Sequence, residues 1–136
     1  MATRSKTTIT VVEYAFFFKF RDGYTEQQEL DMYGGLWSFK DYFPSIMCMS
    51  LGRVLAKEPH GVTHALVMHF ASREALDKYM ADDYRIEVST KTITPFQSGE
   101  YTVDYEANVD SDPQELYKEG KKFDDGVDHV KLFTFK

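Results

Sequence analysis

The 136-residue sequence is poor in cysteine, in positive charge and in long apolar runs. Its single cysteine, Cys48, cannot form a disulfide within the chain, which favours a reducing compartment, and we expect the cytoplasm. No apolar run approaches the roughly 18 residues of a membrane helix, and the start, MATRSKTTIT, lacks the apolar centre of a signal peptide, so we expect no membrane partner. Sixteen basic against 22 acidic residues give a net charge of -6, which argues against nucleic acid as a partner.

Patterns for metal or phosphate binding are also missing from the sequence. No Cys/His pair or carboxylate cluster has metal-ligand spacing, and no glycine-rich phosphate-binding loop is present, so we predict no metal and no cofactor. Aromatic residues are instead abundant, with eleven Phe, nine Tyr and one Trp. Such a chain can bury bulky side chains or line a pocket with them.

The order of predicted elements indicates an α+β fold. Residues 8–20, 46–55, 62–70 and 101–105 read as strands, because β-branched and aromatic residues dominate them. A capping box at Thr25 and Gln28 begins a helix that stops before Pro44, and Ser72 begins a second helix that ends near residue 81. Residues 84–94 form a shorter helical or irregular stretch. The order β-α-β-β-α-β predicts a ferredoxin-like fold with a four-stranded antiparallel sheet.

Two local features need a separate explanation. Gly34-Gly35 inside the first helix predicts a bend or a close backbone approach, since each Gly costs about 1 kcal/mol against Ala there. After a domain at residues 8–106 and a charged linker at 107–126, residues 127–136 resemble the first strand. They are either the start of a second repeat or an extra strand on a sheet edge or a partner, and chance similarity between short apolar strands is the third explanation.

The strands are apolar on both faces, which predicts a homodimer. In the first strand one parity carries Val12, Tyr14, Phe16, Phe18 and Phe20, and the other carries Val11, Ala15 and Phe17. Two helices cover only one face of a four-stranded sheet, and each large side chain buried on the other face contributes roughly 1.5–3 kcal/mol. A second subunit would bury that face by two-fold symmetry. The alternative is that the C-terminal segment folds back over it.

Three segments carry a resemblance to a known family. VEYAFFFKFRDG, PSIMCMSLG and above all GVTHALVMHFASREALDKYM, within residues 8–105, are similar to the stress-responsive A/B barrel family of dimeric α+β barrels. That family includes plant stress-induced proteins and a polyketide cyclase. The resemblance implies a homodimer and a cavity between sheet and helices in each subunit. It implies a substrate-binding lining made of Tyr14, Phe16, Phe18, Met32, Leu36, Leu66 and Met68.

The resemblance also implies which side chains carry any chemistry. In the cyclase a His acts as general base while a Tyr hydroxyl polarises the carbonyl. Tyr79 matches that Tyr, but Arg85 stands where the family has its His, and a guanidinium cannot accept a proton. The candidate catalytic residues are therefore His64, Tyr79 and Arg85, with Arg85 holding a carboxylate or enolate and His64 moving a proton. The alternative makes His64 a core histidine, Tyr79 a packing residue and Arg85 a solvated charge.

Three hypotheses for function follow from these residues. The first is a dimeric, non-catalytic protein that binds a small apolar or carbonyl-containing molecule. The second is a cyclase- or lyase-like enzyme acting on a polyketide-like or other carbonyl substrate with altered catalytic groups. The third is a fragment of a tandem protein whose second copy begins at Val127. The Arg at position 85 favours the first hypothesis over the second.

Overall fold

The computed structural model describes residues 9–55 and 60–109. The chain runs through β1 (Ile9–Phe20), α1 (Glu26–Trp37), α2 (Phe39–Tyr42), β2 (Ile46–Arg53), β3 (His64–Phe70), α3 (Arg73–Ala81), α4 (Asp83–Thr92), η1 (Thr94–Phe96) and β4 (Gln97–Val109). The predicted order of strands and helices is confirmed. Residues 107–109 of the predicted linker belong to β4, whereas its residues 110–126 and the extra strand at 127–136 lie outside the described residues.

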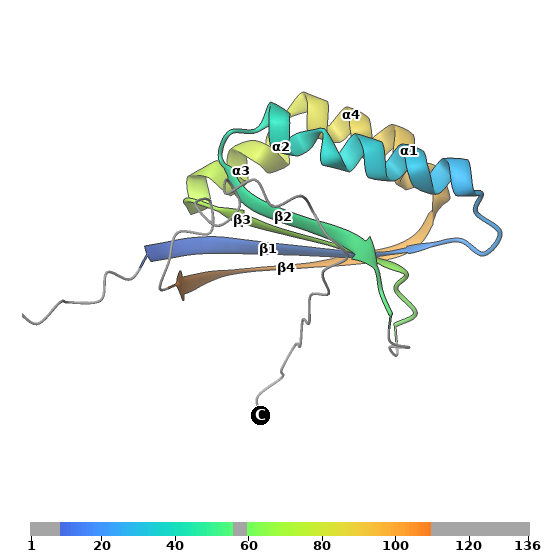
Figure 1. The fold of residues 1–136 in the computed structure, drawn as a ribbon, viewed down its shortest axis with the longest axis horizontal. Helices are drawn as coiled ribbons and strands as arrows, with labels where there is room; N and C mark the ends of the chain where they lie inside the picture. The colour runs from blue at the N-terminus through green and yellow to red at the C-terminus, as the bar shows by residue number, and fades with distance from the viewer. Residues whose placement is uncertain (1–8, 56–59, 110–136) are drawn as a thin grey trace, which may run out of the picture.

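The strands form one antiparallel sheet in the order β2-β3-β1-β4. The helices of the described residues all lie on one side of it, with α1 and α4 side by side above the strands (Figure 1). The two longest strands, β1 and β4, pair along almost their whole length at the centre and edge of the sheet. This is the ferredoxin-like α+β fold that the sequence predicts.

The core lies between the sheet and the helices. The residues of β1 that face the helices alternate with those that face away, and they meet the matching row of β3 in register, as in the pair Phe16 and Leu66. Met32 and Leu36 from α1 and Phe39 from α2 close the core from above, and all three are at most 1% exposed. The aromatic-rich first strand therefore supplies a large part of the core.

The face of the sheet away from the helices, here called the rear face, is apolar as well. In β1 it carries Val11, Ala15 and Phe17, which are buried, and Phe17 stacks on Tyr101 of β4 at 5.0 Å between ring centroids. Towards the flanks the rear face becomes more accessible, and Tyr105 of β4 is 47% exposed. The sheet therefore carries apolar side chains on both faces, as the composition of its strands indicates.

The helices begin where side chains cap them. The predicted capping box is present, since Thr25 Oγ1 accepts from the Gln28 N–H at 3.1 Å while Gln28 Oε1 accepts from the Thr25 N–H at 2.9 Å. Of residues 84–94, predicted as a shorter helical or irregular stretch, residues 84–92 belong to α4, a regular helix of ten residues. Its start was hidden in the sequence because Asp82 ends one helix and caps the next. Within the described residues no helix is long and apolar enough to span a membrane.

Candidate functional site

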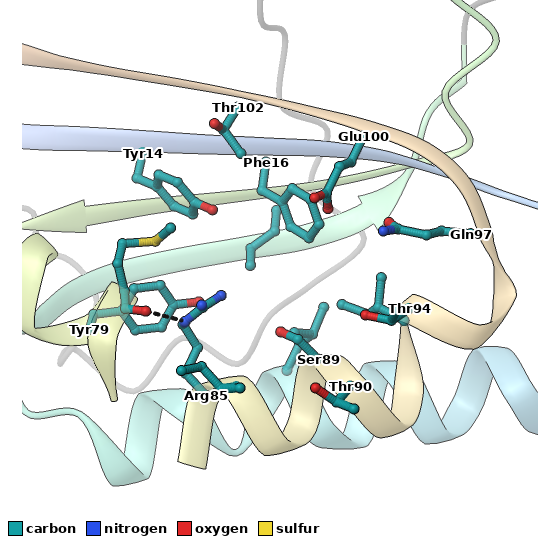
Figure 2. A pocket seen from close by; sticks show the side chains of 15 residues that line it. Tyr14, Phe16, Tyr79, Arg85, Ser89, Thr90, Thr94, Gln97, Glu100 and Thr102 are labelled. Carbon is teal, nitrogen blue, oxygen red and sulfur yellow. Dashed lines mark hydrogen bonds between the residues drawn. The ribbon is translucent and has the colours of Figure 1, made fainter. Parts of the chain in front are cut away.

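A cavity of about 380 Å³ lies between the sheet and α4 (Figure 2). Every layer of the fold contributes to its wall. The residues that line it are Tyr14, Phe16, Leu36, Leu66, Tyr79, Met80, Arg85, Ile86, Ser89, Thr90, Ile93, Thr94, Gln97, Glu100 and Thr102. Its size falls within the range of roughly 300–1,000 Å³ that small-molecule pockets occupy.

A sharp change of direction between α3 and α4 places Arg85 against Tyr79. Asp82 stops α3, and its carboxylate accepts from the Tyr84 N–H at 2.8 Å and the Arg85 N–H at 3.4 Å to begin α4. The Arg85 Nε then donates to the Met80 carbonyl at 3.1 Å, and its guanidinium carbon lies 5.7 Å from the centroid of the Tyr79 ring. The guanidinium is thus held at one end of the cavity with its outer nitrogens directed toward the sheet (Figure 2).

The two tyrosines beside Arg85 remain protonated at neutral pH. Tyr14 and Tyr79 pack edge to face at 6.1 Å between ring centroids. Burial raises the pKa of Tyr14 to about 12, although the charge of Arg85 opposes this shift. Burial also raises the pKa of Tyr79 far above its ordinary value. Both hydroxyls are therefore hydrogen-bond donors rather than bases, and the Tyr14 hydroxyl points into the cavity (Figure 2).

The wall of the cavity divides into an apolar and a polar part. Phe16 and Leu66 supply apolar surface from the sheet and Leu36 from α1, and Ile86 and Ile93 add to it from the α4 side. Polar side chains come from α4 and from β4, where Glu100 and Gln97 extend toward the cavity (Figure 2). Among the described residues, the buried Oε1 of Gln97 has no hydrogen-bond partner. A buried acceptor without a partner is uncommon in folded proteins, so a ligand donor would improve this site.

The structure brings together six of the residues predicted for the site. Tyr14, Phe16, Leu36, Leu66, Tyr79 and Arg85 all line the cavity. Phe18, Met32 and Met68 do not line it and are fully buried in the core. They share the helix-facing side of the sheet with the lining residues, but the helices pack directly on them and leave no space there.

His64 also lies away from the cavity, in a buried polar cluster beneath α1. Its Nε2 is 2.6 Å from Glu29 Oε2 and its Nδ1 is 2.6 Å from Thr63 Oγ1. Glu29 is held on its other side by Arg53, with nitrogen–oxygen distances of 2.8 and 2.5 Å. Burial lowers the pKa of His64, and the Glu29 hydrogen bond only partly offsets this. The structure thus gives His64 carboxylate and hydroxyl partners in the core.

Apart from Arg85, sequence reasoning missed the contributions of α4 and β4 to the cavity. Arg85 and Ser89, like Ile86 and Thr90, are four residues apart, so they lie on one face of a helix. This spacing indicates a shared face only if residues 83–92 form a helix, and the sequence left that open. Glu100 and Thr102 gave no such signal, because an edge strand alternates polar residues whether or not a cavity lies beside it.

The strand order and the single helical layer define the class of this protein, an α+β protein of ferredoxin-like fold with a cavity between its layers. Within that class the chain belongs to the stress responsive A/B barrel domain family, whose family model matches residues 12–107. A comparison with curated protein sequences gave no match.

Several solved structures share this fold at low sequence identity. An Arabidopsis thaliana protein is 21% identical with a TM-score of 0.62, covering 69% of this chain and 92% of its own. Hydroxynitrile lyase from Passiflora edulis is 16% identical with a TM-score of 0.65, covering 72% and 94%. A dimeric ferredoxin-like protein of unknown function from Thermobifida fusca is 14% identical with a TM-score of 0.62, covering 71% and 91%. At these identities the likeness concerns the fold alone.

Proposed function

We propose that this protein is a homodimeric A/B barrel protein that binds a small molecule with an apolar body and a carbonyl or carboxylate group. The observation that carries the proposal is the cavity in which Arg85 and the protonated Tyr14 hydroxyl lie at one end of an apolar wall. Both groups donate hydrogen bonds, and hydrogen bonds from a charged donor to an anionic oxygen are about twice as strong as neutral ones.

The ligand proposed here has three recognisable parts. Its oxygen would accept from Arg85 and Tyr14, and its apolar body would lie against Phe16 and the leucines beside it. A hydroxyl or amide donor elsewhere on the ligand would satisfy Gln97 Oε1, the buried acceptor without a partner among the described residues. A small aromatic carboxylate or ketone with a hydroxyl group fits this description.

A cyclase- or lyase-like enzyme is the second candidate. The likeness in fold to a hydroxynitrile lyase favours it. Against it, the described residues that line the cavity include no histidine, and Arg85 cannot accept a proton. Glu100 is the one carboxylate among the described lining residues, so the enzyme hypothesis would have to give it the role of base. Binding needs no such additional assumption, and we therefore place it first.

Pairing of two copies through the rear face is the second part of the proposal. The described helices lie on the other side of the sheet (Figure 1), and the flanks of the rear face carry accessible apolar side chains such as Tyr105. Several structurally similar proteins, including the one from Thermobifida fusca, are dimeric. A cytoplasmic location, expected from cysteine use, completes the proposal.

Matched ligand pairs test the binding function. We would titrate the protein by calorimetry with 3-phenylpropanoate and 3-phenylpropanol, which differ only in the oxygen group, and with their para-hydroxyl analogues. We expect the carboxylate of each pair to bind at least about tenfold more tightly, in line with a charge-assisted hydrogen bond. Arg85→Gln should remove this preference, and Tyr14→Phe should reduce it.

Lys91→Gln is the matched control, because Lys91 lies on the same helix, is exposed and pairs with Glu87. This variant should keep the preference for the carboxylate. Equal affinity for both members of every pair, or chemical-shift changes in the NMR spectrum that avoid the cavity residues, would contradict the proposed ligand chemistry. Turnover of a carbonyl substrate that Glu100→Gln abolishes would favour the enzyme instead.

A further inference from the structure

Three ionisable side chains meet on the rear face, on the opposite side of the sheet from the cavity. Cys48 of β2, His69 of β3 and Glu13 of β1 lie on three adjacent strands, with His69 directly opposite each of the other two. The Cys48 Sγ is 3.0 Å from His69 Nδ1, and His69 Nε2 is 2.8 Å from Glu13 Oε1. Together they form a continuous hydrogen-bonded row across the sheet.

A β-bulge in β2 is what brings Cys48 into this row. Ile46 pairs with Phe70, but the next pair joins Cys48 with His69, so Met47 is the extra residue. Without this irregularity Met47 would stand opposite His69, and Cys48 would face the helices. Bulges re-aim side chains and are over-represented next to active sites. The local backbone thus selects a thiol rather than a thioether as the neighbour of the imidazole.

The row has the chemistry of an activated nucleophile. The Glu13 carboxylate only accepts hydrogen bonds, so it fixes the proton of neutral His69 on Nε2. The other ring nitrogen, Nδ1, then carries the lone pair and can accept the thiol proton of Cys48. Once protonated, the imidazolium remains beside the Glu13 carboxylate, which stabilises its charge. A nucleophile, a base and a group that orients the base are the arrangement found in thiol enzymes.

The row is also partly accessible. The His69 and Glu13 side chains retain 21% and 18% exposure, and Cys48 is half-buried. β2 is the outer strand of the sheet, so the sulfur lies at the border of the rear face rather than at its centre. Reaction at this sulfur therefore requires that a second copy paired on the rear face leave the β2 edge open, so that a small reagent reaches the sulfur along that edge.

We propose that Cys48 is a reactive thiol that adds small α,β-unsaturated carbonyl compounds, with His69 as its base and Glu13 as the positioning residue. In the reaction the sulfur forms a bond to the β-carbon while the carbon–carbon double bond is lost. The thiol proton passes to His69 Nδ1 and then to the α-carbon, so the product is a neutral thioether. No oxidant or reductant takes part. This inference stands apart from the ligand cavity.

The rate of addition of N-ethylmaleimide tests the proposal. We would follow adduct formation by intact-protein mass spectrometry at pH 7, for the folded protein and for the same protein unfolded in urea. The unfolded chain gives the intrinsic rate of this thiol. We expect the folded protein to react about fivefold faster or more, because the imidazole raises the thiolate fraction. A folded protein that reacts no faster than the unfolded chain would overturn the proposal.

Variants assign the roles within the row. His69→Gln should bring the ratio of folded to unfolded rates to about one or below. Glu13→Gln should reduce the ratio and move the pH–rate profile to higher pH, since the imidazolium loses its carboxylate. The ionisable groups around the His69 ring are Cys48 and Glu13, which contact it, and Tyr105 of β4, which lies opposite Glu13. Glu106→Gln, an exposed change on β4, should keep the wild-type ratio and profile. Circular dichroism would confirm that each variant is folded. A wild-type ratio of folded to unfolded rates in His69→Gln would show that His69 is not the base.

Discussion

At the scale of single residues, Glu29 and His64 stand out as the buried polar side chains of the described chain. Hydrogen bonds from Arg53 are the main reason why the pKa of Glu29 is lowered from 4.5 to about 2. A folded-state pKa below the unfolded value means that the carboxylate stabilises the fold above about pH 4.5 and loses this effect as the pH falls toward about 2. His64 acts in the same direction, because its lowered pKa lets the unfolded chain bind the proton first below pH 6.5.

We therefore predict that the free energy of unfolding decreases on acidification, first below about pH 6.5 and then between about pH 4.5 and 2. Urea melts across this pH range measure it. Glu29→Gln should flatten the lower window, because no carboxylate remains there to be protonated. Glu74→Gln is the control, since Glu74 is 80% exposed and pairs with Lys78 across one helical turn. An unchanged pH slope in Glu29→Gln would contradict the assignment.

Truncating His64 tests its place in the core. His64→Ala removes a side chain with no exposed surface and the hydrogen-bond partner of Glu29, so we expect a loss of about 2–4 kcal/mol in denaturant melts. Tyr79→Phe is a matched comparison, since it keeps the buried ring and removes one hydroxyl. We expect it to change stability much less and to affect ligand binding instead. Equal stability of His64→Ala and the parent protein would show that the cluster contributes little.

Sequence alone could not separate His64 from the residues of the cavity. His64 and Leu66 share one parity of β3, and both face the helices. Only the helix above each position decides whether the side chain meets packed atoms or open space, and Glu29 on α1 is 35 residues away in the chain. Tyr79 and Arg85 were named through the family resemblance, and the structure places them together because both flank the turn at Asp82 between α3 and α4.

At the scale of secondary-structure elements, the contact between α1 and α4 explains one of two neighbouring glycines. A Cβ on Gly35 would meet the Val88 Cγ1 at 2.7 Å, whereas a Cβ on Gly34 would have no heavy atom within 4 Å. The paired glycines predicted a bend or a close approach, and the structure shows the close approach at Gly35. Sequence could not identify the partner helix, because its start at Asp82 depends on a cap shared with α3.

These glycines form a matched pair for mutagenesis. Gly34→Ala should stabilise the protein by about 0.5–1 kcal/mol, because Ala favours the helix and nothing opposes its methyl group. Gly35→Ala should destabilise it by about 1–3 kcal/mol, since the β-branched Val88 has little freedom to move aside. Thermal and urea melts would show opposite signs. Adding Val88→Ala should recover part of the Gly35→Ala loss, and a gain in stability from Gly35→Ala alone would contradict the close approach.

At the scale of the whole molecule, the sequence predicted the fold well and the cavity only in part. Strand composition, the capping box and the order of elements follow from local chemistry, so they can be read from the chain. The lining of the cavity depends instead on how α4 and β4 stand over the sheet, as Glu100 and Ser89 show. The sheet is apolar on both faces, and this feature predicts contact with a second chain.

Pairing through the rear face can be tested with two apolar residues of similar exposure. Tyr105 lies on the rear face of β4 and is 47% exposed, whereas Leu30 lies on α1 and is 53% exposed. In a rear-face dimer, Tyr105→Glu would place carboxylates in an apolar contact beside Glu13, its strand partner. We expect native mass spectrometry and light scattering to show a dimer for the parent protein and for Leu30→Glu, but mostly monomer for Tyr105→Glu. A dimer disrupted only by Leu30→Glu would move the interface to the helices, and a parent protein that is monomeric at every concentration would refute pairing itself.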